Sequence, residues 1–364
     1  MAVARQALAA LANDLLENSS ESSDDSERSD NEEHPVRPFL MNDIPERLLF
    51  QRTRLDRTVF NYVLQLISPA LTKNTKKGRY SHLTPMHKLY VALQFYATGT
   101  YQWMVGSSSR ISQSATSKAI HEVTAALVEV APQFIRFPAA AEYPTVKQAF
   151  YALGMTRHGA GFPNVLGAID CTHVRIQKPS TEAPEQYLNR HLYYSINVQL
   201  VVSSSLKIFN VFAAFPGSNH DSFIWRNSAV RDGIVAGNFT EGWLVGDSGY
   251  PQEPWLMTPV TVPTTVPEQL YNAVHISTRN PVERTNGVLK SRWHVLDSPL
   301  AYSPAKVCAI TTACCVLHNI CTEYNLEVED LQEHPLHDDL PFQGPQNPDY
   351  NDVRGNLIRQ HFTR

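Results

Sequence analysis

The sequence has few cysteines and no long apolar run near its beginning. Five of the 364 residues are cysteine, and four of these lie between Cys308 and Cys321, unlike the evenly spread cysteines of a disulfide-stapled secreted domain. The apolar stretch at residues 7–12 is interrupted by Asn13 and Asp14 before it reaches the length of a signal core or a membrane span. These absences predict a soluble intracellular protein with reduced cysteines and no membrane partner.

The formal net charge of −4 hides an uneven distribution of charge along the chain. Residues 1–33 carry nine acids and two arginines, and residues 322–364 carry nine acids and three arginines, so residues 34–321 have a net charge of +9. A basic body between acidic ends favours a polyanionic partner.

Four segments are expected along the chain. Residues 19–33 contain seven acids and no apolar residue, so they cannot bury enough surface to offset the entropy of ordering. We therefore expect a disordered acidic tail over residues 1–34. Residues 326–364 are again acidic and rich in proline, which predicts a largely extended C-terminal segment. Between these ends, a helical domain over residues 35–160 precedes an α/β domain over residues 161–325.

The helical domain has the outline of a helix-turn-helix. Thr84 and Pro85 are typical of the start of one helix, and Ser112 is placed as the N-cap of another. The stretch of residues 99–112 would join them, and the second helix would present Lys118 near its start, in position to contact DNA. Two amphipathic helices packed around a glycine-containing loop give the same pattern, and both interpretations stay open.

After residue 161 the pattern changes to strands. Apolar or alternating runs predict strands over residues 164–176, 195–203, 207–215 and 242–245, with the second and third forming a hairpin. Helices are expected over residues 222–234, 281–295 and 304–324. Three antiparallel strands, a helix, a fourth strand and further helices form the element order of an RNase H-like α/β core, a mixed sheet flanked by helices.

Two aspartates fall where such a sheet would bring them together. Asp170 lies inside the first apolar run, where an ionised carboxylate is costly unless it is paired or bound to a cation. Asp247 ends the fourth strand, which neighbours the first in the RNase H-like order. A simple turn at residues 247–249 is an alternative explanation for the second aspartate.

Two further acids are candidates for the same site. Glu283 lies in the helix expected to begin at Pro281, where a capping box with Asn280 would also explain it. Asp221 precedes the helix that follows the third strand, where it would serve equally well as an N-cap. A cluster of such oxygen donors suits Mg²⁺ or Mn²⁺, and two ions roughly 3.5 to 4 Å apart can drive phosphodiester cleavage without a nucleophilic side chain.

Basic residues on the same helix suggest contacts to DNA. Gly287 and Lys290 lie four and seven positions after Glu283, so one helical face would offer a carboxylate, a gap and a cation to a phosphate backbone. Lys290, Arg292 and Lys118 are therefore the candidate DNA contacts.

Two other kinds of site fit the sequence less well. An aspartic protease needs two aspartates in matching signatures, but Asp170 and the residues after it do not match. A zinc site from Cys314, His318 and Cys321 would share one helical face, yet paired Cys-x-x-Cys knuckles are absent and the surrounding residues are apolar. A core helix with small side chains is the favoured interpretation.

Five ordered stretches resemble the Harbinger (PIF) family of D-D-E transposases and the cellular nucleases derived from them. These stretches are GAIDCTHVRI, FPGSNHDSFIW, WLVGDSGYP, VERTNGVLKSRW and ACCVLHNI, spanning residues 167–320. The resemblance implies catalytic carboxylates at Asp170, Asp247 and Glu283, with Asp221 as a further metal ligand.

The resemblance also implies a function and a setting. It implies a divalent-metal-dependent nuclease that cleaves DNA, with strand transfer as a further activity; the alternative is a domesticated protein that binds DNA or acts as a scaffold without cleaving it. The resemblance likewise implies that the protein acts in the nucleus, with a share in the cytoplasm. It also implies an oligomer and a Myb-like DNA-binding partner protein. The chain has no clean lysine-rich nuclear signal, since its basic residues at 73–79 form only a loose cluster that a solvated loop explains.

Overall fold

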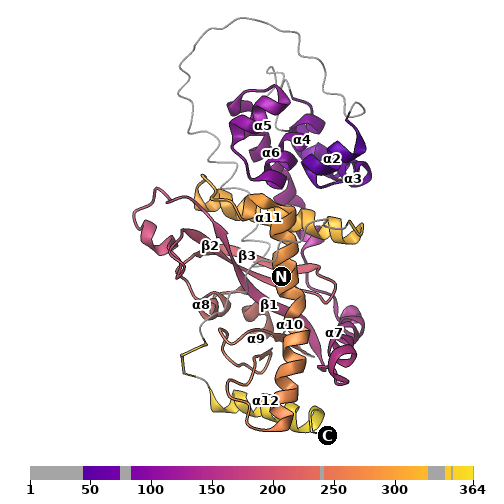
Figure 1. Cartoon of the computed structure of the whole chain (residues 1–364), viewed down its shortest axis with the longest axis vertical. Coiled ribbons are helices and arrows are strands. Elements are labelled where there is room, and N and C mark those ends of the chain that lie inside the picture. Colours follow the sequence, from indigo (N-terminus) through magenta and orange to yellow (C-terminus); the bar gives the residue numbers. More distant parts are fainter. Residues whose placement is uncertain (1–43, 74–82, 238–241, 327–340, 346, 364) are drawn as a thin grey trace, which may run out of the picture.

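The computed structural model describes residues 44–73, 83–237, 242–326, 341–345 and 347–363, and it places a helical region at one end of a five-stranded sheet with its own helices (Figure 1). The predicted acidic tail at residues 1–34 and the acidic stretch at 327–340 lie outside these described residues, as does most of the basic cluster near residue 76.

The helical region confirms the two predicted helix starts. It consists of α2 (Glu46–Thr53), α3 (Arg57–Lys73), α4 (Pro85–Thr98), α5 (Gln102–Ser109) and α6 (Gln113–Phe134). The Thr84 side chain accepts a hydrogen bond from the backbone N–H of His87, and that of Ser112 accepts one from Ala115. These caps fix the first turns of α4 and α6.

The stretch expected to be a loop between α4 and α6 contains a helix, α5. Only residues 110–112 separate α5 from α6, and a Cβ at Gly106 would lie 2.7 Å from Oγ1 of Thr116, so the two helices approach closely at this glycine. The helix-turn-helix outline therefore belongs to α5 and α6. Binding of DNA by this pair stays a prediction.

The sheet has the predicted RNase H-like order. Its strands are β1 (Val165–Arg175), β2 (Ser195–Val202), β3 (Ile208–Pro216), β4 (Trp243–Val245) and β5 (Leu256–Met257), arranged β3-β2-β1-β4-β5. The first three are antiparallel, while β4 pairs with β1 in parallel and the two-residue β5 extends the sheet. Ala168 pairs with Val245, so Asp170 and Asp247 both lie two residues beyond paired positions on neighbouring strands.

Helices cover both faces of the sheet (Figure 1). One face packs against α7 (Tyr143–His158), α10 (Val266–Arg292) and α11 (Pro304–Glu323), and the other against α8 (Asp221–Arg226) and α9 (Ala229–Val235). Short 3₁₀ turns lie at Ala140–Glu142, Pro184–Tyr187 and His294–Leu296. This arrangement excludes the all-β fold of an aspartic protease.

Helix α7, which precedes the domain boundary predicted at residue 160, packs with the sheet. Its Phe150 is fully buried in the core that includes β1, a Cβ at Gly154 would lie 2.7 Å from Cγ1 of Val274 on α10, and Nε2 of His158 lies 2.8 Å from Oγ of Ser277. Helical periodicity identifies the helix but does not show which core its apolar side joins.

The helix expected over residues 281–295 begins fifteen residues earlier than predicted, at Val266. A capping box of Thr265 and Glu268 starts it, and Pro281 lies in its interior. Packing on the sheet stabilises the helix despite the proline, which is itself buried. Asn280 is therefore not an N-cap, and the capping-box explanation of Glu283 is wrong.

The helix expected over residues 222–234 is also divided. It is two short helices, α8 and α9, because Ser228 caps a new helix by accepting a hydrogen bond from the backbone N–H of Arg231.

Part of the C-terminal segment, which we expected to be largely extended, is helical. Helix α12 (Pro348–His361) buries Leu357, and the ring of the following Phe362 lies 5.8 Å from that of Phe162 and 5.5 Å from that of Tyr271. Acidic, proline-rich composition does not show that two apolar residues anchor the segment to the core.

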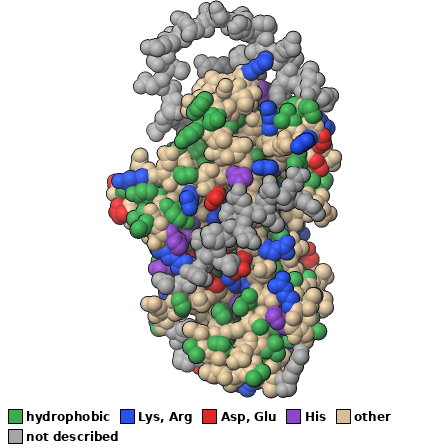
Figure 2. All heavy atoms as spheres, in the orientation of Figure 1, with side chains coloured by type: hydrophobic (Ala, Val, Ile, Leu, Met, Phe, Trp, Pro, Cys, Tyr) green, Lys and Arg blue, Asp and Glu red, His purple; other side chains and the backbone are tan. Residues whose placement is uncertain are grey.

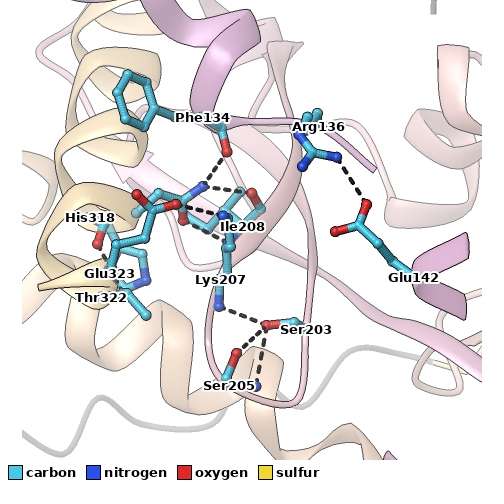
Figure 3. Close-up of polar contacts among 11 residues, drawn as sticks. Phe134, Arg136, Glu142, Ser203, Ser205, Lys207, Ile208, His318, Thr322 and Glu323 are labelled. Carbon is cyan, nitrogen blue, oxygen red and sulfur yellow. Dashed lines mark hydrogen bonds and ion pairs between the residues drawn. The ribbon is translucent and has the colours of Figure 1, made fainter. Parts of the chain in front are cut away.

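Helix α11 joins the helical region to the sheet near Phe134 and Ile208, which are labelled in Figure 3. The buried Asn319 side chain accepts a hydrogen bond from the N–H of Ile208 at 2.8 Å, and its Nδ2 donates to the carbonyls of Ile208 at 2.7 Å and Phe134 at 3.0 Å. The Asn319 side chain thereby links the backbone of the edge strand β3 to the last residue of α6. By length and composition α11 could cross a membrane, but 83% of its most apolar window is buried inside the protein, as in a core helix.

We expect Asn319→Ala to lower the free energy of unfolding by about 3 kcal/mol, because three buried backbone groups lose their partner. Lys207→Ala is the control, since Lys207 bonds Glu323 nearby at 2.6 Å between two part-exposed side chains and should contribute less than about 1 kcal/mol. Denaturant unfolding measures both. Equal losses of unfolding free energy in the two variants would contradict the role of Asn319 in joining the helical region to the sheet.

Candidate active site

Three aspartates from separate parts of the chain meet at one point. Asp170 lies on β1, Asp221 begins α8 and Asp247 follows β4, and one carboxylate oxygen from each lies within 4.8 Å of the other two. The Asp170 side chain is 14% exposed and Asp221 is buried. The structure thus brings together three of the four predicted acids.

Neighbouring groups orient these carboxylates. Asn197 on β2 donates from Nδ2 to Oδ1 of Asp221 at 3.1 Å, and the N–H of Gly249 donates to Oδ1 of Asp247 at 3.0 Å. The second bond is the predicted turn, so Asp247 belongs to both the turn and the cluster. Asp221 is not the N-cap of α8, a position occupied by His220.

The fourth acid, Glu283, is linked to the cluster through an arginine. Arg279 places Nη1 3.4 Å from Oδ1 of Asp170, and its Nη2 contacts Oε1 of Glu283. Asn286 donates from Nδ2 to Oδ2 of Asp170 at 3.1 Å. Helix α10 therefore holds both oxygens of Asp170 from one face.

Sequence reasoning missed Arg279 and Asn286. Residues 279, 283 and 286 have the spacing of one helical face, but this spacing becomes visible only when the helix extends back to Val266. A helix starting at Pro281 leaves Arg279 outside it.

The electrostatics of the site follow from burial beside the three carboxylates. Burial and the nearby charges of Asp221, Asp170 and Asp247 raise the pKa of Tyr250 well above its usual value. Burial opposes the charge of Arg279, yet Asp170 and Glu283 outweigh it and raise the pKa of this guanidinium. Arg279 thus remains a cation and compensates part of the negative charge.

The donors in this cluster are all oxygen atoms. Hard cations such as Mg²⁺ and Mn²⁺ take carboxylate oxygens, whereas zinc favours nitrogen and sulfur. Clustered, largely buried carboxylates repel one another unless a cation lies between them, so the residues present fit a divalent ion.

The zinc alternative is not supported among the described residues. Cys314, His318 and Cys321 are fully buried in the core helix α11, and Nε2 of His318 lies 2.8 Å from the carbonyl oxygen of Leu206. Burial lowers the pKa of His318 to about 4 and raises that of the Cys314 thiol. The core-helix interpretation accounts for all three residues.

Two of the three candidate DNA contacts are buried, so their prediction is wrong. Lys290 donates from Nζ to the carbonyl oxygen of His173 at 2.9 Å, and Arg292 contacts the carbonyl of Leu326. Both anchor α10 inside the protein. Lys118 has a side chain that is 72% exposed, and its contact with DNA stays a prediction. Lysine and arginine side chains are spread over the whole visible face of the molecule (Figure 2).

We expect Arg279→Gln to destabilise the protein in EDTA by roughly 3 kcal/mol, because the carboxylates lose their buried counter-charge. Added Mn²⁺ should then raise the melting temperature more in this variant than in the wild type. Arg284→Gln, at an exposed position of the same helix, is the control. Thermal unfolding with and without Mn²⁺ tests this, and an unchanged melting temperature of Arg279→Gln in EDTA would contradict it.

Lys290 should give stability a recognisable pH dependence. Burial lowers its pKa from 10.5 to about 8, with Arg175 lowering it further and Asp297 opposing the change. Between these values the unfolded chain binds more protons, so this lysine makes stability rise with pH, by about 3 kcal/mol in total.

Lys290→Met should remove that rise. Unfolding free energies of variant and wild type, compared between pH 8 and 10.5, should therefore diverge in favour of the wild type as pH increases. Lys118→Met is the exposed control. A constant difference across this window for Lys290→Met would show that Lys290 is not buried as described.

Comparisons with known proteins agree with this geometry. A family model described as DDE superfamily endonuclease matches residues 169–319, which include all four acids. The protein named "Putative nuclease HARBI1" in Bos taurus is 34% identical over 334 residues, covering 89% of this chain and 93% of the relative, and the Homo sapiens protein of that name gives the same figures.

A plant relative is more distant. "Protein ALP1-like" of Arabidopsis thaliana is 26% identical over 303 residues, covering 78% of this chain and 72% of the relative. No solved structure matches the chain. Sequence, fold and the position of the acids agree, and the chain belongs to the family of Harbinger transposase-derived nucleases within the DDE superfamily endonucleases.

Proposed function

We propose that this protein is an endonuclease that cleaves DNA phosphodiester bonds with the help of divalent cations. The observation that carries the proposal is the meeting of Asp170, Asp221 and Asp247 within 4.8 Å, on three elements of a DDE-type core. Metal binding would use these three side chains, with Glu283 completing the set from α10. Bound there, Mg²⁺ or Mn²⁺ would activate a water or a 3′-hydroxyl and stabilise the leaving oxygen.

The chain's own residues prepare the site for this chemistry. Asn197 and the N–H of Gly249 fix the orientation of Asp221 and Asp247, so their oxygens need little reorganisation. Asn286 does the same for Asp170. Arg279 pairs with both Asp170 and Glu283 and so holds the two side chains near each other. When cations bind, the guanidinium would either move away from these carboxylates or bind them together with the cations.

The same arginine supports a second candidate function. Its guanidinium already lies against Asp170 and Glu283, so it compensates the charge of these acids without a cation. A protein that binds DNA as a scaffold, without cleaving it, could therefore keep the same acids. Action in the nucleus, with a share in the cytoplasm, and a Myb-like partner are proposals that rest on the family resemblance alone.

Nicking of supercoiled plasmid DNA in Mg²⁺ or Mn²⁺ tests the proposed function. Asp170→Asn and Asp247→Asn should each reduce nicking at least about 100-fold, because each removes a charged ligand that the transition state requires. Asp232→Asn, at an exposed position on α9, should nick like the wild type.

Two results would count against the proposal. Cation-dependent nicking that survives Asp170→Asn would place the chemistry elsewhere. Wild-type protein that binds plasmid but leaves it intact in both cations would favour the scaffold.

A further inference from the structure

A tight turn beside the carboxylates holds an exposed leucine in an unfavourable conformation. Leu192 lies in the turn at residues 189–194, between the 3₁₀ turn Pro184–Tyr187 and β2. Its side chain is 81% exposed, and its φ of 60° is in the left-handed region that side-chain-bearing residues seldom adopt. Folding rewards neither feature, which points to a use outside the fold.

The turn is built to hold this leucine in place. Asn189 is buried, and its Oδ1 accepts hydrogen bonds from the N–H of His191 at 2.9 Å and of Tyr193 at 3.3 Å. The N–H of Leu192 donates to the carbonyl oxygen of Asn189 at 3.0 Å, and Nδ2 of Asn189 donates to Oγ of Ser195 at 3.2 Å. Leu192 therefore projects from a fixed base.

Aromatic and cationic side chains lie in the same turn and beside it. The rings of His191 and Tyr193 stack at 6.3 Å with 16° between their planes, and the guanidinium of Arg175 lies 4.4 Å from the centre of the Tyr193 ring. Arg190 is exposed in the same turn. Residues 171–181 and 186–200, which supply these groups, contain no acidic residue.

A cavity connects the turn to the carboxylates. It has a volume of about 40 Å³, and its walls include Arg190 of the turn together with Asn197, Asp221 and Gly249. Asn197 and Gly249 are the groups that orient Asp221 and Asp247. Arg190 of the turn and Asp221 of the carboxylate cluster therefore line the same small cavity, so a polyanion bound at the carboxylates would lie beside the turn.

We propose that the turn at residues 189–194 is a DNA wedge: Leu192 inserts between two adjacent base pairs next to the cleavage point, while Arg175 and Arg190 contact the flanking phosphates. A single apolar side chain among cations and rings suits a base step, whereas a protein-docking surface presents a wider apolar patch. Partial unstacking would bend the duplex toward the carboxylates. This inference rests on the proposed function, because it requires DNA as the substrate.

The wedge is tested by duplex unwinding, which needs neither cleavage nor a known target sequence. All proteins carry Asp170→Asn so that the plasmid stays intact, and plasmid linking number is measured after relaxation by a type I topoisomerase. Insertion of Leu192 unwinds the duplex, so the parent should lower the linking number. Binding is measured separately by fluorescence anisotropy on a short duplex.

Leu192→Ala should remove at least about half of the unwinding at saturation while changing the dissociation constant less than about 3-fold. Leu192→Asn should lose unwinding to the same extent as Leu192→Ala. Because asparagine readily adopts the left-handed conformation, this variant keeps the turn intact and excludes a distorted turn as the cause. Val262→Ala, at an apolar position that is 72% exposed outside the turn, should unwind like the parent. Arg175→Ala and Arg190→Ala should each weaken binding and reduce its salt slope by about one.

Several results would overturn the wedge. The first is full unwinding by Leu192→Ala. The second and third are a parent protein that binds DNA without unwinding it, or that does not bind DNA at all. The fourth is loss of self-association in Leu192→Ala, which would make the turn a contact between copies of the chain. Nicking by protein with native Asp170 is scored separately. Nicking with no effect of Leu192 on unwinding rejects the wedge alone, and unwinding without nicking rejects the nuclease alone.

Discussion

The mutual repulsion of three carboxylates is the constraint on which the rest of the site depends. At an effective dielectric constant of about 20, each pair of charges within 4.8 Å costs at least about 3 kcal/mol. Three neighbours offset this repulsion: Asn197 and Asn286 donate to carboxylate oxygens, and Arg279 adds a partly buried positive charge. Such an arrangement disfavours the fold without a cation, and it fits the divalent cation that we propose the carboxylates bind.

The long helix α10 and the sheet register together create this arrangement. Parallel pairing of β1 with β4 sets Asp170 and Asp247 at the same level, and α8 adds Asp221 from the chain that follows β3. Helix α10 then crosses β1 with one face, which carries Arg279, Glu283 and Asn286 toward Asp170 and places Lys290 against the backbone of β1 at His173. The same edge of the sheet leads through the small cavity to the turn that presents Leu192.

Much of this could be predicted from sequence, for identifiable physical reasons. Four of the five strands follow from apolar or alternating runs, and Asp170 is conspicuous because it interrupts one of them. The two-residue β5 was not predicted, because it is too short to show such a pattern. The extent of α10 could not be predicted, since Pro281 is a strong local signal that packing overrides. That error hid Arg279. Lys290 and Arg292 were predicted at the surface for another reason, because spacing along a helix does not show which of its faces is buried. Likewise, the α12 anchor at Phe362 depends on partners such as Phe162 that lie far away in sequence.

The proposed function requires that the aspartate cluster binds a divalent cation. The most direct measurement is anomalous diffraction from crystals of the full chain equilibrated with Mn²⁺. We expect an anomalous peak in contact with Asp170, Asp221 and Asp247, together with a shift of the Arg279 guanidinium relative to crystals in EDTA. Crystals at saturating Mn²⁺ with no peak at these aspartates, and with Arg279 unmoved, would contradict it.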